Sequence, residues 1–165
     1  MHPLELDGWG DFAVASAGAG AALAGLIIVA MSVNIKEIIA GEGLPARAAA
    51  TISSVVVILV ASIALLVPGQ PATALGVELA VFAVVGLVFQ VNAARLMLTL
   101  RVGAALPWRV AQSADGVLQM LVVLVGALFV TAGSATGLYL VAVGFVLIFV
   151  IALVNAWVLM VEILR

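Results

Sequence analysis

The residues of this chain that could do chemistry are a few amides and charges embedded in apolar sequence. Gln112, Asp115 and Gln119 stand at i, i+3 and i+7, a spacing that predicts one shared helix face. A carboxylate at the centre of a membrane span costs about 2.5–3.5 kcal/mol on insertion scales. We therefore expect Asp115 to face the bundle interior and to be protonated, hydrated or paired, with Arg95 as its nearest cation.

Other polar residues gather toward the same end of their apolar segments and could complete a pocket. The predicted pocket residues are Asn34, Gln90, Asn92, Arg95, Gln112, Asp115, Gln119, Asn155 and Glu162. Polar groups in hydrocarbon need partners or water, so they should point into the bundle. Two interpretations stay open: a cytoplasm-facing polar pocket, or interhelical hydrogen bonds worth about 0.6 kcal/mol each with charges reaching to the interface.

Enzyme chemistry has little support in these residues. The one histidine, His2, lies at the terminus, and cysteine is absent, so no imidazole or thiol is available within a span for a proton relay, a haem or a zinc site. Asp115 is the only aspartate in a span, which excludes a membrane aspartyl dyad. We predict a protein that is not an enzyme and that holds no cofactor or metal.

Composition sets the class of protein. Hydrophobic residues make up 67% of the 165 residues and charged residues 8%, with a mean hydropathy of +1.42. Soluble domains carry roughly 25% charged residues. The chain has too little polar surface for water, so the lipid bilayer is its predicted partner, and a net charge of −2 offers no basic field for nucleic acid.

The apolar segments predict an all-α membrane domain that covers residues 1–165. A membrane helix needs about 20 apolar residues. Five such segments are predicted, at 12–33, 48–67, 73–94, 110–131 and 138–160. A four-span alternative makes the Gly- and Ala-rich start of the first segment re-entrant.

The cations predict the orientation. Lys and Arg all fall at one end of the apolar segments, at Lys36, Arg47, Arg95, Arg101, Arg109 and Arg165. The connections at the other end, 68–76 and 132–137, have neither residue. Short basic loops stay in the cytoplasm, so we expect the N-terminus outside and the C-terminus inside. Aromatic residues belong at the interfaces, with Trp9, Phe12 and Tyr139 outside and Trp108 and Trp157 inside.

An internal repeat is a further signal. Asn34, Asn92 and Asn155 lie at or near the same end of alternate spans. The similar segments Leu44-Pro-Ala-Arg47 and Leu106-Pro-Trp-Arg109 follow the first two asparagines. This pattern predicts two tandem parallel helical hairpins plus a fifth helix that begins a third unit. Convergence is the alternative, because each helix end needs a polar stop.

Small residues recur every four positions on two spans. Ala17, Ala21 and Gly25, and Gly18 with Ala22, form such rows on the first span. Gly144, Ala152 and Ala156 form a similar face on the fifth. Rows of this kind allow close helix approach, within the chain or with a second one.

The first hairpin carries a resemblance. The stretch from Gly25 to Ile39, with Leu44-Pro-Ala-Arg47 and Leu66-Val-Pro-Gly-Gln70, resembles small uncharacterised bacterial polytopic membrane proteins, some loosely labelled as modulators of a membrane AAA protease. The resemblance implies a multi-pass protein of the bacterial cytoplasmic (inner) membrane.

Two functions remain open from the sequence. One is an accessory or modulatory membrane protein that acts through helix–helix contacts with a homo-oligomer or another membrane protein. The other is a small oligomeric channel or transporter with a cytoplasm-facing polar vestibule, although Glu78 is the only charge that could continue a path through the outer half.

Overall fold

The structure, a computed structural model, describes residues 8–99 and 106–163. Its helices are α1 (Trp9–Val33), α2 (Ile35–Ala40), α3 (Leu44–Leu65), α4 (Ala72–Thr99), α5 (Leu106–Thr131) and α6 (Thr136–Ile163). Five of them, all except α2, are long and apolar enough to cross a membrane. The prediction of an all-α, five-span bundle is confirmed, and the chain is a multi-pass membrane protein.

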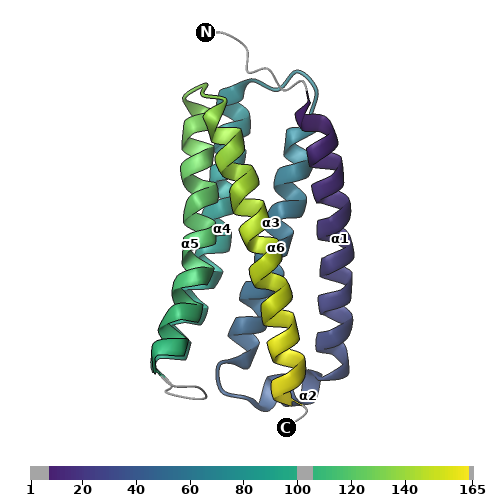
Figure 1. The fold of residues 1–165 in the computed structure, drawn as a ribbon, viewed down its shortest axis with the longest axis vertical. Coiled ribbons are helices and arrows are strands. Elements are labelled where there is room, and N and C mark those ends of the chain that lie inside the picture. The colour runs from purple at the N-terminus through teal and green to yellow at the C-terminus, as the bar shows by residue number, and fades with distance from the viewer. Residues whose placement is uncertain (1–7, 100–105, 164–165) are drawn as a thin grey trace.

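The five long helices run alternately up and down (Figure 1). Helices α3, α4, α5 and α6 form a ring in which each contacts the next, and α1 packs on α3 and α6. Helix α3 is the most enclosed, with 61% of its most apolar 18-residue window buried, because neighbours cover it on three sides. Short turns make this order possible, and Gly69 and Gly133 adopt the left-handed backbone that those turns need.

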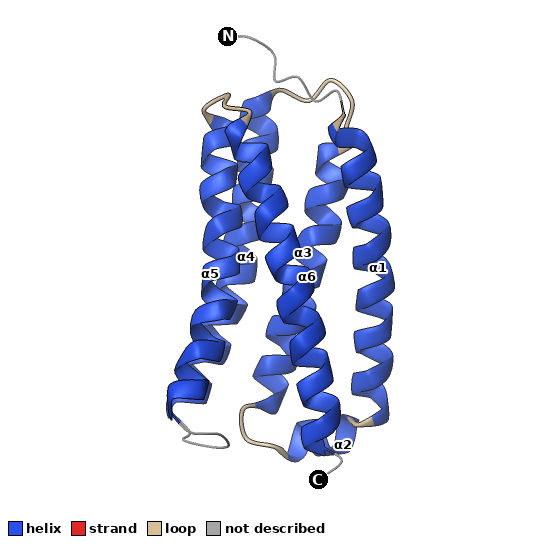
Figure 2. Ribbon diagram, in the orientation of Figure 1, coloured by secondary structure: helices blue, strands red, loops and turns tan. Residues whose placement is uncertain are grey.

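Two segment ends differ from the prediction. At the end of the bundle where α6 also ends, which we name the inner end, the short helix α2 stands where a loop was expected (Figure 2). Its Ile38 is buried, whereas Lys36 and Glu37 are exposed. Helix α4 continues to Thr99, five residues past its predicted end, so Arg95 belongs to the helix and not to a loop.

The apolar core consists of two clusters at different positions along the bundle axis. A large cluster fills the outer half, with Leu79, Met120, Val123 and Phe145 fully buried among others. A smaller cluster that includes Ile27 and Ile38 joins α1, α2, α3 and α6 at the inner end. The polar cavity described below lies in the inner half, between α3, α4, α5 and α6.

Aromatic rings tie α1 to α6 at the outer end. Trp9 meets Phe12 edge-on at 5.7 Å and Tyr139 edge-on at 5.0 Å, between ring centroids. Phe12 also stacks on Phe145 at 6.1 Å. The three residues predicted at the outer interface thus lie together. At the other end, Trp157 is exposed, and the side chain of Trp108 lies outside the described residues.

The three asparagines of the predicted repeat have different surroundings. Asn34 follows α1 and its side-chain amide donates to the Ala30 carbonyl at 3.0 Å. Asn92 is exposed on α4, and Asn155 lines the polar cavity from α6. The three side chains therefore have three different environments, and the duplication of the helical hairpin stays a prediction.

Glycines let three helices approach at backbone distance. A Cβ at Gly137 of α6 would lie 2.5 Å from the Gly126 carbonyl oxygen and 2.6 Å from the Val130 nitrogen of α5. Gly76 of α4 abuts the Thr131 backbone in the same way. By contrast, a Cβ at Gly18 or Gly25 of α1 would meet nothing within 4 Å.

This contrast gives the first prediction. Gly137→Ala should destabilise the bundle by about 1–3 kcal/mol, because backbone atoms that cannot move aside would have to shift. Gly18→Ala should be neutral or stabilising by up to about 1 kcal/mol, because alanine is the better helix former. Equilibrium unfolding in mixed micelles measures both, and equal losses for the two variants would contradict the packing.

Candidate functional site

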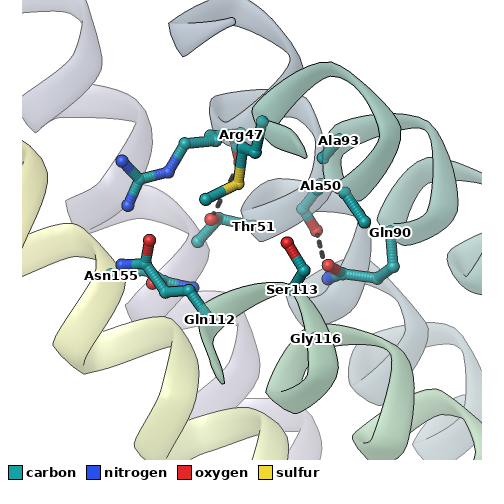
Figure 3. Close-up of a pocket in the computed structure, with 11 residues that line it drawn as sticks. Arg47, Ala50, Thr51, Gln90, Ala93, Gln112, Ser113, Gly116 and Asn155 are labelled. Atoms are coloured by element: carbon teal, nitrogen blue, oxygen red, sulfur yellow. Dashed lines mark hydrogen bonds between the residues drawn. The ribbon is translucent and has the colours of Figure 1, made fainter. Parts of the chain in front are cut away.

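The candidate site is a small polar cavity in the inner half of the bundle (Figure 3). Its volume is about 30 Å³. That is room for about one or two water molecules. Its lining comes from four helices: Arg47, Ala50, Thr51, Gln90, Ala93, Ala94, Met97, Gln112, Ser113, Gly116 and Asn155.

A polar clasp lies beside the cavity and joins three helices. Gln90 of α4 donates from Nε2 to the Ala50 carbonyl at 3.2 Å and to Ser54 Oγ at 2.6 Å, both on α3. Gln119 of α5 donates to the same Ser54 oxygen at 3.3 Å. Gly116 makes room for the clasp, because a Cβ there would collide with the Gln90 amide.

Two buried polar atoms of α5 near the cavity have no hydrogen-bond partner among the described residues. They are Ser113 Oγ and Gln119 Oε1. Buried polar atoms are normally paired with protein or with ordered water. Ser113 lines the cavity, so water held there would pair with its hydroxyl group.

Arg47 supplies the only charge among the lining residues. It lies in the first turns of α3, and its carbonyl accepts a hydrogen bond from Thr51 Oγ1 at 3.0 Å. Figure 3 shows its guanidinium group on the side of the cavity where Asn155 and Gln112 lie. The lining therefore combines one cation with hydroxyl and amide groups, which can hold water or a small polar ligand but include no group that exchanges a proton near neutral pH.

A second arginine closes the inner end of the α4–α5 pair. Arg109 is 7% exposed and donates from Nε to the Met97 carbonyl and from Nη2 to the Leu98 carbonyl, each at 2.8 Å. These carbonyls belong to the last turn of α4, where no intrahelical donor remains. A cation is also favoured at a helix C-terminus. This contact explains why α4 extends beyond its predicted end.

Four of the nine predicted pocket residues belong to the cavity or the adjacent clasp. Gln90, Gln112 and Asn155 line the cavity, and Gln119 is buried in the adjacent clasp. Asn34 caps its own helix, and the Glu162 side chain lies outside the described residues. Asn92, Arg95 and Asp115 are exposed on the lateral surface of the bundle.

The prediction that Asp115 faces the interior is wrong. Asp115 is exposed, and no hydrogen bond or ion pair joins it to Arg95 or to any other described residue. The physical reason is angular, since Asp115 lies about 60° around the helix from Gln112. Only 39% of the most apolar 18-residue window of this span is buried, so that rotation carries the side chain from the packed arc to the surface.

The predicted pocket residues do not include four residues that build the site. They are Arg47, Thr51 and Ser54 of α3 and Ser113 of α5. Arg47, Thr51 and Ser54 stand at i, i+4 and i+7, which is a single helix face. That spacing was visible in the sequence, but Arg47 was assigned to a loop and its face was not recognised.

Comparison of the chain with family models, curated proteins and solved structures finds no match. The resemblance carried by the first hairpin therefore stays an expectation, and function is inferred from the geometry.

Two adjacent serines test the clasp. Ser53 and Ser54 both donate to the Ala50 carbonyl, at 2.9 and 3.0 Å, but only Ser54 also accepts from Gln90 and Gln119. Ser54→Ala should cost about 1–2 kcal/mol of unfolding free energy, because it leaves a buried amide without its partner. Ser53→Ala should change stability by less than about 0.5 kcal/mol. Equal effects in micelle unfolding would show that the clasp does not stabilise the bundle.

Proposed function

We propose that this chain is an accessory or modulatory protein of the bacterial inner membrane, and that it acts by docking a transmembrane helix of another membrane protein against α1. The observation that carries this proposal is a row of small residues on the outer face of α1. Ala15, Gly18, Ala22 and Gly25 are all exposed and follow a 3-4-3 spacing. This is the spacing by which two long helices stay in contact over several turns.

The glycines of this row, Gly18 and Gly25, make no close helix contact within the described protomer. A glycine inside a helix costs about 1 kcal/mol relative to alanine. Elsewhere in the bundle that cost is offset by close contacts, as at Gly137 and Gly76, but Gly18 and Gly25 face open space. Small residues at such positions allow a second helix backbone to come close in lipid, where packing drives association.

The other small-residue face already has a partner. Gly144 of α6 packs against Val123 of α5, and Ala152 is buried in the inner apolar cluster. Of the two helices on which the sequence predicted small-residue rows, α1 is therefore the one left for an external helix.

The channel alternative has weaker support. Beyond the clasp, the buried side chains of α3, α4, α5 and α6 are apolar apart from Ser62 of α3. Among them, Leu79, Ala83, Val123 and Phe145 have zero exposure. A cavity of about 30 Å³ that ends against such a core can hold water but offers no continuous path through the described bundle.

Orientation is part of the proposal. Lys36, Arg47, Arg95 and Arg109 all belong to the inner end of the bundle, and the described turns at the other end contain no Lys or Arg. The positive-inside rule then places the start of α1 outside and the end of α6 in the cytoplasm.

Reporter fusions check this orientation. A reporter fused after Arg165 should be active in the cytoplasm, and one inserted at Ala135, in the turn between α5 and α6, should be active outside. The same location for both reporters would contradict the five-span orientation.

Site-specific photo-crosslinking tests the docking face. A photoreactive residue at Ala22, in membranes of cells that make the protein naturally, should yield an adduct with a different membrane protein. The same residue at Val125, an exposed position on α5, serves as the control and should give no adduct with a different membrane protein. Gly18→Leu combined with Gly25→Leu should reduce the Ala22 adduct several-fold, since the larger side chains hold the partner backbone away.

We expect these variants to fold, because Gly18 and Gly25 face open space and a Cβ at either would meet nothing within 4 Å. An absent adduct, an adduct of two identical chains, or an adduct that persists in the leucine variant would each contradict docking of a different protein on α1.

A further inference from the structure

We propose that identical chains assemble into a closed ring, in which Asp115 of one protomer pairs with Arg95 of the next. This inference is independent of the docking function, because it uses a different surface. Helices α4 and α5 lie on the side of the bundle away from α1 (Figure 1).

Asp115 has no cation beside it among the described residues of its own chain. It is exposed on α5 and makes no hydrogen bond or ion pair with any described residue. It lies nine residues after the start of α5. That is about 13 Å along a helix whose 26 residues exceed the thickness of the hydrocarbon layer. The carboxylate is therefore well inside the acyl region, where an unpaired anion is costly.

Arg95 is the complementary charge, and it belongs to the same chain. It is exposed on α4, and its side chain has no hydrogen bond or ion pair with the described residues. A chain that presents both an anion and a cation to lipid is complementary to a second copy of itself. A second copy is therefore the occupant that this surface fits, since each protomer supplies what the next one lacks.

The two charges can meet at one depth. Gly116 of α5 lies beside Gln90 of α4, and Met120 beside Gly86, so Asp115 is level with residues 91 and 92. Arg95 is about one helical turn, or 6 Å, nearer the inner end. Side chains lean toward the N-terminus of their helix. Because α4 and α5 are antiparallel, Arg95 leans toward the membrane centre and Asp115 leans toward the inner surface.

The same geometry prevents the pair from forming within one chain. On α4, Arg95 lies about 180° around the helix from Gly86, which faces α5. On α5, Asp115 lies about 140° from Met120, which faces α4. Both side chains therefore point away from the contact between their own helices.

The placement also sets the symmetry. A two-fold dimer needs its anion and cation on one self-complementary patch, whereas here they project from different sides of the α4–α5 pair. A head-to-tail contact between different patches satisfies every charge only when the ring closes, which requires three or more protomers.

Charge exchange tests the pairing. The wild-type protein in mild detergent with added lipid should have the mass of three or more chains by native mass spectrometry. Asp115→Asn and Arg95→Gln should each weaken association roughly tenfold or more. The combined variant Arg95→Asp with Asp115→Arg should restore the wild-type mass. Lys36→Gln, which removes an exposed cation at the same end of the bundle, is the control and should leave the mass unchanged.

A disulfide experiment in native membranes tests the ring without any charge variant. The chain contains no cysteine, so Asn92→Cys with Leu118→Cys introduces the only thiols, one turn from each charge. Oxidation should give a ladder of at least three chains, and Asn92→Cys alone should give none. A wild-type monomer, a mass that does not respond to Asp115→Asn, a charge exchange without rescue, or a ladder that stops at two chains would overturn the ring.

Discussion

Close contact between helix backbones is the interaction on which this fold depends. Lipid is as apolar as the helices, so burial of leucine and valine against lipid or against protein differs little in free energy. What distinguishes the native arrangement is the fit of α4, α5 and α6 at Gly76, Gly126, Gly137 and Gly144, where no other residue leaves room. The ring of four helices follows from these contacts, and α1 is added through aromatic rings at one end and an apolar cluster at the other.

Polar side chains add specificity to this packing. Ser54 accepts from both Gln90 and Gln119, so one hydroxyl oxygen fixes the register of α3, α4 and α5. Arg109 performs a similar task at the inner end by holding the last carbonyls of α4. The cavity between these two features is a consequence of gathering polar groups in the inner half, and the outer half, which has few of them, is packed shut.

The fold was predictable from sequence because membrane spans depend on length and hydropathy, which are local properties. The site was only partly predictable, because facing direction depends on contacts that are not local. Gln119 lies in the packed arc of α5 and Asp115 outside it, although both belong to one polar stripe. The end of α4 could not be placed because Arg109, from the next helix, extends it. Likewise, small-residue rows predicted helix contacts on both α1 and α6. Only the structure shows that Gly144 of α6 packs against Val123, whereas Gly18 of α1 has no neighbouring helix beside it.

The glycines thus separate into those that hold the protomer together and those that face outward, and the outward group is assigned to a partner helix. Electron paramagnetic resonance tests this assignment most directly, through the oxygen accessibility of a spin label at Ala22. We expect high accessibility in pure lipid vesicles, where only the protomer or its own assemblies are present, and strongly reduced accessibility in native membranes, where the partner covers α1. Equal, high accessibility in both membranes would contradict the account.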